Sequence, residues 1–311
     1  MNVLLFVVIP LVVGYYVGKK GWFPERWIKP VQVFFIVTAQ PVIQWFAIWQ
    51  MTWKWQLAWL PLVGLVLAAL NLGVGYLLYR TLPERRAGSE SSIFATSLSN
   101  MGPTGGNLIL LFLFGTQAVG EGTIFISYFM PWTFALCFPL AARMAGPGYT
   151  GGRSLKGVLL APHSMPIVGL ALGIATLIWI PPPEWVAPSL SVLMKITAPI
   201  SLAVLGTRIR ISQVRHYVRK IVAVSGAKFL LTPVVGLAMA YLVGFDALTT
   251  SVVLVMALCP VAVFSVVIGH IFDLDVDLAN SLFLVTSILF FIGIVPLLML
   301  AQEVGVLPAG G

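Results

Sequence analysis

Apolar stretches long enough to cross a bilayer dominate this sequence. A helix needs about 20 apolar residues to cross roughly 30 Å of hydrocarbon, and the 311 residues contain ten such windows. The windows span residues 2–18, 30–50, 57–79, 91–114, 119–142, 162–180, 188–207, 217–243, 247–269 and 278–300. Only 9% of the residues are charged, whereas about a quarter are charged in soluble domains. The sequence therefore predicts an all-α integral membrane protein with ten transmembrane helices.

The basic residues lie almost entirely on one side of this topology. If the N-terminus is outside, 15 of the 18 Lys and Arg residues fall in loops on the opposite side. Lys54 is the exception on the outer side, and Lys195 and Lys228 lie within windows. Cytoplasmic loops of membrane proteins carry this excess of positive charge. We therefore expect both termini outside the cell (inner) membrane, and the net charge of +8 to reflect topology rather than binding of nucleic acid.

Prolines recur in the two halves of the chain at a nearly constant offset. Six of the ten prolines in the first half have a partner 156 to 158 residues later, in the same order. The pairs are Pro10–Pro166, Pro24–Pro181, Pro30–Pro188, Pro41–Pro199, Pro103–Pro260 and Pro139–Pro296. Prolines could gather at similar places in any membrane helix, but a constant offset across helices and loops favours duplication.

Five helices per copy is an odd number, so a second copy enters the membrane in the opposite sense, as in the inverted repeats of many transporters. We expect a first five-helix repeat at 1–145, a cytoplasmic linker at 146–161 and a second, inverted repeat at 162–311.

Proline and glycine also predict where the helices are irregular. Pro41 and Pro199 lie near the middle of the second and seventh windows, where a proline kinks a helix. The stretch 97–107 in the fourth window combines three glycines, Pro103 and two asparagines, and Pro260 is its repeat partner in the ninth window. Opened backbone inside a bilayer is tolerated only where protein or a water-filled cavity satisfies it. We therefore expect the fourth and ninth helices to be broken and to cross near the bilayer centre, with half-helix N-termini that suit an anionic group.

Several motifs resemble those of the auxin efflux carrier family, which includes plant auxin exporters and bacterial permeases for organic acids. The fourth window reads Asn-Met-Gly-Pro-Thr-Gly-Gly-Asn-Leu from Asn100 to Leu108, followed by Leu113-Phe114-Gly115. The segments 260–269 with 274–281, 197–206, and Lys228 with Pro233 are also similar to family patterns. The family's crossover proline falls on Asn107 here, and the corresponding position of the ninth helix is Phe264.

This resemblance implies a bacterial member with an elevator mechanism, distantly related to the sodium-coupled bile acid symporters. Helices one, two, six and seven would form a dimerising scaffold, so a homodimer is expected. Helices three to five and eight to ten would form the transport unit, which carries a small organic anion past the scaffold within the membrane lipid.

The candidate substrate-binding residues gather around the two expected breaks and the second-helix kink. They are Gln40, Asn100, Pro103, Thr104, Asn107, Lys195, Lys228, Pro260, Phe264 and Ser265. Asn100 and Asn107 could donate to substrate or cap the broken helix, and Thr104 could instead bond to a nearby carbonyl. Lys228 could serve the substrate site or donate to carbonyls of the neighbouring broken helix, and Lys195 could attract an anion or extend to the interface.

No catalytic residue, metal site or cofactor is expected. The three histidines are scattered at window ends, and the acidic cluster at 273–277 lacks the glycine and glutamate of a calcium loop. An intramembrane hydrolase lacks support because no His or Asp lies at depth to activate Ser97, Ser99 or Ser265.

No acidic residue falls clearly at mid-membrane depth, which favours passive or potential-driven movement over proton coupling. Two alternatives stay open. One is a sodium-coupled symporter of the bile acid type, and the other is a non-transporting lipid or sterol sensor, favoured by Phe264 and the apolar half-helix around it.

Overall fold

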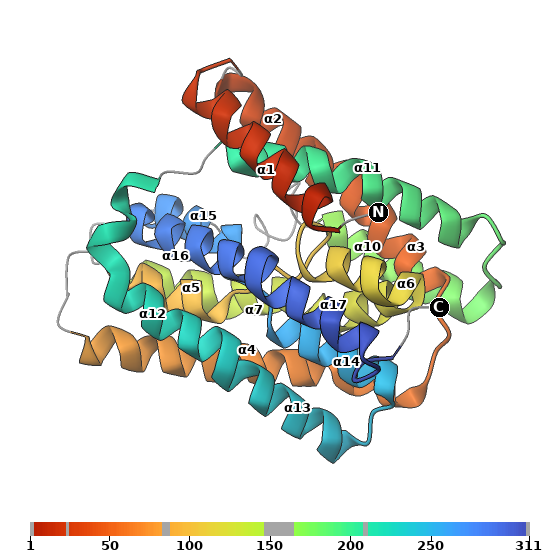
Figure 1. Cartoon of the computed structure of the whole chain (residues 1–311). Coiled ribbons are helices and arrows are strands. Elements are labelled where there is room, and N and C mark those ends of the chain that lie inside the picture. The colour runs from red at the N-terminus through yellow and green to blue at the C-terminus, as the bar shows by residue number, and fades with distance from the viewer. Residues whose placement is uncertain (1–2, 23–24, 83–87, 146–164, 208–210, 309–311) are drawn as a thin grey trace.

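The computed structural model describes residues 3–22, 25–82, 88–145, 165–207 and 211–308 (Figure 1). The linker expected at 146–161 lies outside these described residues. Within them the regular elements are helical, and one isolated β-bridge is the only extended pairing. The α-helices are α1 (Val3–Lys19), α2 (Glu25–Phe34), α3 (Gln40–Trp49), α4 (Leu60–Thr81), α5 (Ser91–Ser97), α6 (Gly106–Phe125), α7 (Phe129–Trp132), α8 (Phe138–Met144), α10 (Met165–Trp179), α11 (Val186–Gly206), α12 (Val218–Gly226), α13 (Thr232–Val243), α14 (Ala247–Ala257), α15 (Val263–Ile271), α16 (Val276–Ile288) and α17 (Val295–Glu303). The 3₁₀ segments are η2 (Trp55–Trp59), η3 (Ile126–Tyr128) and η6 (Ile211–Tyr217).

The helical runs have the length and composition of an integral membrane protein. Five are long and apolar enough to span a bilayer: Trp55–Thr81, Gly106–Met144, Val186–Gly206, Val214–Val243 and Val276–Glu303. Four shorter apolar helices accompany them, at Phe6–Lys19, Phe35–Trp49, Met165–Trp179 and Ala247–Ala257. The helical membrane character expected from the sequence is therefore present, while the count of ten spans and the inverted repeat stay predictions.

Four π-helical segments share one position relative to a proline. They are η1 (Phe35–Ala39) before Pro41, η4 (Thr133–Cys137) before Pro139, η7 (Ala227–Leu231) before Pro233 and η8 (Leu289–Ile294) before Pro296. A proline ring clashes with the carbonyl four residues earlier in an α-helix and leaves one hydrogen bond unmade. A single wider turn at that point moves the carbonyl aside, and such π-bulges are common within α-helices.

Pro41 and Pro199, the two expected kink sites, differ in this respect. A wide turn precedes Pro41, whereas α11 continues through Pro199 as one α-helix. The kink at Pro199 stays a prediction.

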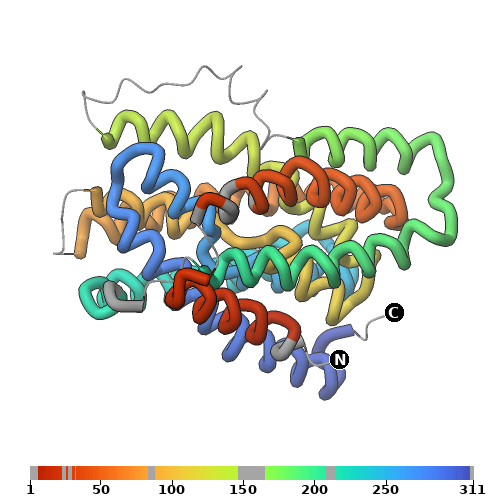
Figure 2. The backbone as a smooth tube through the Cα atoms, turned by 90° about the horizontal axis from the view of Figure 1, so that it is seen from above, coloured from red at the N-terminus to blue at the C-terminus, as the bar shows by residue number. Residues whose placement is uncertain are grey.

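The helices form two groups with α11 central to the first. Helices α1, α2, α3, α10 and α11 lie together along one side of the molecule, and the remaining helices lie below them (Figure 1). Seen from above, α11 lies between α1 and the α2–α3 run (Figure 2). Helices α3 and α11 face the second group where they pack against α6.

Glycines allow α1 and α11 to approach backbone to backbone. A Cβ atom at Gly14 of α1 would lie 1.9 Å from the Ala203 carbonyl oxygen of α11. A Cβ atom at Gly206 of α11 would lie 2.4 Å from the Leu11 carbonyl oxygen of α1. Small residues at such contacts drive helix association in membranes, where the hydrophobic effect between helices is absent.

We expect Gly14→Ala to separate α1 from α11 and to lower the free energy of unfolding by about 1–3 kcal/mol, the usual cost of overpacking. Gly73→Ala in α4 is the matched control, because a Cβ atom at Gly73 meets no atom within 4 Å. Alanine there should be neutral or stabilising, since it is the better helix former. Thermal unfolding of both variants in detergent checks this, and equal melting temperatures would refute the close-contact account.

Candidate functional site

Two interrupted helices meet at their interruptions. Helix α5 ends at Ser97 and α6 begins at Gly106, while α14 ends at Ala257 and α15 begins at Val263. The segments between them pair as a short antiparallel bridge between Ser99 and Val261. The Asn100 N–H donates to the Pro260 carbonyl at 2.8 Å, and the Ala262 N–H donates to the Leu98 carbonyl at 2.9 Å. Each break therefore satisfies backbone groups that the other leaves open.

The first break folds back tightly on itself, which explains its glycines. The N–H groups of Gly106 and Asn107 donate to the carbonyls of Asn100 and Met101, at 3.1 and 2.9 Å. A Cβ atom at Gly105 would lie 1.9 Å from the Asn100 carbonyl oxygen. A Cβ atom at Gly106 would lie 2.7 Å from the Cys259 sulfur of the other break. A larger residue at Gly105 would disrupt the fold of the first break, and one at Gly106 would push the two breaks apart.

A cavity of about 300 Å³ lies between the paired breaks and the first group of helices. Its wall comes from η1 and α3, from the second half of α11, from the two breaks, and from η3, α7 and α15. The lining side chains of α11 lie between Thr197 and Leu205, near its C-terminal end, and those of the α2–α3 run lie between Phe35 and Gln44. The cavity thus extends from the crossing breaks toward the end of the molecule where α11 ends and α2 begins.

The polar groups of this cavity are uncharged among the described residues. None of the lining residues that the structure describes is Asp, Glu, Lys, Arg or His, and the polar side chains are Gln40, Gln44, Ser99, Asn100, Thr104, Thr197 and Ser201. The Asn100 Oδ1 atom accepts from Thr104 Oγ1 at 3.3 Å, while its amide nitrogen has no hydrogen-bond partner among the described residues. The N–H groups of Val263 and Phe264, at the start of α15, likewise have no partner within the described chain. The lining residues therefore include donors that the described chain leaves unpaired.

Half of the predicted site residues line the cavity. Gln40, Asn100, Pro103, Thr104 and Phe264 are on its wall. The Phe264 ring packs edge-on against Phe129, which also lines the cavity, with centroids 6.0 Å apart.

The other predicted residues lie away from the wall. Asn107 is 1% exposed, and its amide nitrogen donates to Thr123 Oγ1 at 3.2 Å. The Ser265 hydroxyl donates to the Ala262 carbonyl at 2.7 Å, and the Pro260 carbonyl is used by Asn100. Lys195 is exposed on α11. Substrate contact by these residues stays a prediction.

Lys228 lies behind the crossing point. Its side chain is fully buried in η7, and Nζ donates to the Leu98 carbonyl and to the Ser99 hydroxyl of the first break. Ser99 itself lines the cavity. Of the two interpretations open from the sequence, donation to carbonyls of the broken helix is the one that the structure has. The Lys228 Nζ atom thus lies one residue behind the wall.

Some functional positions were not singled out from the sequence. Thr197 and Ser201 line the cavity from one face of α11, and their i, i+4 spacing within a window could have indicated them. Glu121 of α6 is fully buried, and it lies near the start of the fifth window. Depth along a window does not reveal which way a side chain points.

Crossing interrupted helices beside a cavity, in a chain of apolar helices, are features of membrane transport proteins. Consistent with this class, residues 155–299 match the model of the family described as "Membrane transport protein". A relative from Methanothermobacter thermautotrophicus, named "Uncharacterized transporter", is 29% identical over 142 residues. That match covers 46% of this chain and 46% of the relative, so it spans about half the length of each. The second half of the chain is therefore similar to the membrane transport protein family, in agreement with the family resemblance of its motifs.

Lys228→Met should destabilise the crossing point. It leaves the Ser99 hydroxyl without its donor and removes a charged hydrogen bond to Leu98, and bonds to charged groups contribute about 1.5–3 kcal/mol each. Lys195→Met removes a similar but exposed side chain and should change the free energy of unfolding by less than about 0.5 kcal/mol. Thermal unfolding of both variants compares them, and equal stability would mean that the Lys228 bonds do not hold the break.

Proposed function

We propose that the protein carries a small organic anion, a carboxylate or auxin-like acid, across the membrane by alternating access. The observation that carries this proposal is the cavity itself. It lies where two interrupted helices cross, its lining residues carry unpaired donors, and the described part of its wall has no acidic side chain. Transporters bind their substrates at broken helices of this kind.

The donors suit one carboxylate group. Asn100, Val263 and Phe264, which carry these unpaired donors, line the same cavity. The N-terminus of α15 adds the positive end of a helix dipole, which favours anions. Lys228 holds Ser99 from behind the wall through a hydrogen bond. A carboxylate held here would replace water at donors that the fold leaves open.

The rest of the wall suits an apolar body. Phe35, Ile43, Phe129, Phe264 and Val267 supply aromatic and aliphatic surface. A volume of about 300 Å³ is at the lower end of ordinary small-ligand pockets. We infer a monocarboxylate of modest size rather than a large polyanion.

Offsets between corresponding elements support two inverted repeats, and the two groups of helices support an elevator motion of one group past the other. Helices α6 and α15 begin at Gly106 and Val263, and the offset of 157 is the one seen in the prolines. The wide turns η4 and η8 lie at the same offset, to within one residue. Helices α1, α2, α3, α10 and α11 would form the scaffold, with a second copy of the chain across it in a homodimer. The other helices would move past them with the substrate.

Charge placement supports the orientation. Lys19 and Lys20 lie at the end of α1 and Arg26 at the start of α2, whereas Lys54 lies in the linker after α3. The cavity would then open to the cytoplasmic side of the cell membrane, and both termini would lie outside. Uniport of a monoanion outward would gain about 2.3 kcal/mol per 100 mV of inside-negative potential.

Ligand binding with the Asn100→Ala variant tests this function. A panel of monocarboxylates, dicarboxylates, aromatic acids and sterols is screened by thermal shift on the purified protein. A ligand at 100 times its Kd stabilises a protein by about 2.7 kcal/mol. Loss of one hydrogen bond to a charged group, about 1.5–3 kcal/mol, should weaken binding of the acid about 10- to 150-fold in Asn100→Ala.

Lys195→Gln is the control, and it should bind as the parent does because Lys195 lies away from the cavity. Stabilisation by sterols alone, unaffected by Asn100→Ala, would overturn the transport proposal in favour of a lipid or sterol sensor. Flux in proteoliposomes that follows a proton or sodium gradient at clamped potential would overturn the uniport mechanism.

A second candidate, sodium-coupled symport, rests on one buried atom. Asn107 Oδ1 is buried without a hydrogen-bond partner in the described chain, beside the Thr123 hydroxyl. Carbonyl-type oxygens of this kind are ligands for hard cations. A sodium ion between α6 and the crossing point would satisfy it.

Sodium should then raise the melting temperature above its value in potassium at equal ionic strength, and Asn107→Ala should abolish the difference. Ser287→Ala is the control, because Ser287 Oγ is also buried and unpaired among the described residues but lies in α16. Identical melting curves in the two salts would rule out this candidate.

A further inference from the structure

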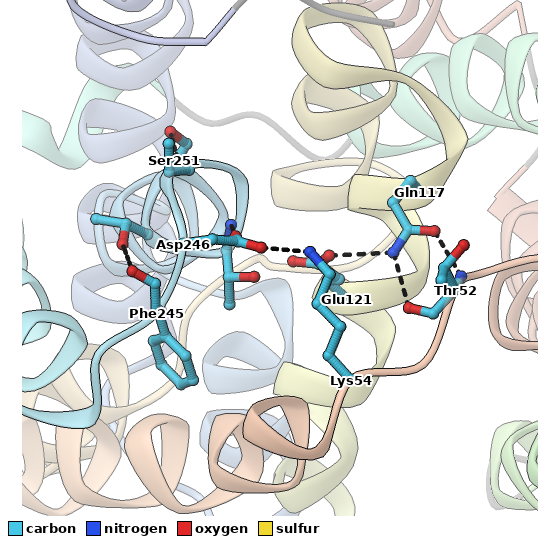
Figure 3. A network of polar contacts seen from close by, with 10 residues as sticks. Thr52, Lys54, Gln117, Glu121, Phe245, Asp246 and Ser251 are labelled. Carbon is cyan, nitrogen blue, oxygen red and sulfur yellow. Dashed lines mark hydrogen bonds and ion pairs between the residues drawn. The ribbon is translucent and has the colours of Figure 1, made fainter.

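A polar network joins the 50–54 linker after α3 to α6 and to the start of α14 (Figure 3). The Thr52 N–H donates to Gln117 Oε1 at 2.7 Å, and Gln117 Nε2 donates to the Thr52 carbonyl at 3.2 Å. Lys54 Nζ donates to Asp246, which also caps α14 by accepting from the Thr249 N–H at 2.8 Å. Gln50 and Thr116 exchange hydrogen bonds one turn away.

Glu121 lies inside this network with one oxygen unpaired. Its side chain is 0% exposed, and it is the only fully buried acidic group among the described residues. Oε1 accepts from Gln117 Nε2 at 3.1 Å, while Oε2 has no hydrogen-bond partner in the described chain. Figure 3 shows the carboxyl group between the Gln117 amide and the Lys54–Asp246 pair. An ionised carboxylate is costly to bury unless a positive charge is near.

Lys54 and Asp246 are the charged groups that act on Glu121. They come from the linker and from the start of α14, and no ionisable group of α3, α4, α11 or α17 adds to them among the described residues. The hydrogen bond to Asp246 raises the pKa of Lys54 above its usual value. Partial burial raises the pKa of Asp246, but the hydrogen bonds from Lys54 and Thr249 outweigh it and hold that pKa below its usual value.

Lys54 and Asp246 therefore both stay charged at neutral pH. Their pairing stabilises the fold there and is lost as the pH falls through the lowered pKa of Asp246.

We propose that Glu121 is a proton-binding site whose occupancy depends on the position of the 50–54 linker. With the linker in place, the carboxyl group is shut off from water and lies near the Asp246 carboxylate, and both favour its protonated form although Lys54 opposes them. If the linker moves away, water reaches the group and solvates its ionised form. The O–H bond on the free oxygen then breaks and the proton passes to water, with no other bond changed. Movement of the linker would thus release one proton, whichever substrate the cavity holds.

Infrared spectroscopy of the full-length protein in lipid vesicles tests proton binding without any substrate. We expect a carbonyl stretch of a protonated carboxyl group that appears and disappears across a pH series. The band should be absent from Glu121→Gln, which keeps the shape of the side chain and an acceptor for Gln117. It should remain in Glu184→Gln, which removes an exposed acid. A band unchanged in Glu121→Gln would overturn the proposal, and the melting temperature of each variant shows that it is folded.

A second measurement tests the dependence on the linker. In Lys54→Met the band should persist to higher pH than in the parent, because the cation that favours the ionised form is gone. If the pH dependence of the band is unchanged, protonation of Glu121 does not depend on the linker. Replacing potassium by sodium at fixed pH should leave the band unaltered, and a response to sodium would assign the site to a metal ion instead. These results are independent of the anion-binding assay, so either proposal can fail alone.

Discussion

Hydrogen bonding of backbone groups inside an apolar environment is the constraint on which this structure depends. Two helices are interrupted, and the unpaired N–H and C=O groups of each interruption are used by the other. The Leu98 carbonyl accepts from both the Ala262 N–H and Lys228, and the Val261 N–H donates to Thr286 Oγ1. Because these bonds hold the breaks open in a fixed shape, the cavity has a defined wall. Asn100, Val263 and Phe264, which keep unpaired donors, are among the residues that line it.

Prolines shape the helices around the site in a different way. Each of four prolines follows a single wide turn, so the helix accommodates the ring without ending. The segment η1 places Phe35, Ile36 and Ala39 on the cavity wall, and η7 carries Lys228. Irregular turns thus coincide with functional side chains, as is frequent for π-bulges. The α1–α11 contact, by contrast, is regular and close, as Gly14 and Gly206 require.

The sequence predicts the apolar helices and the position of both breaks, because hydropathy and glycine–proline chemistry act locally. It also indicates Asn100, Pro103 and Phe264, which line the cavity because they belong to the breaks themselves. The sequence is less informative where the burial of a residue depends on the direction in which its side chain points. Lys195 and Lys228 both lie within windows, yet one is exposed and the other is fully buried. Glu121 is a similar case, since its burial depends on how the linker folds over α6.

The pairing of the two breaks has a consequence for biosynthesis. The first break leaves the ribosome about 160 residues before the second, and its Leu98 carbonyl and Asn100 N–H have their partners on that later segment. Domains usually fold as they emerge, N-terminal part first, but here the early half cannot complete its structure alone. The unpaired backbone groups of the first break therefore stay in contact with water or with the insertion machinery until residues 258–262 have been synthesised. Assembly of the crossing point is therefore a late step, and a chain truncated after its first half would expose unpaired backbone to the lipid.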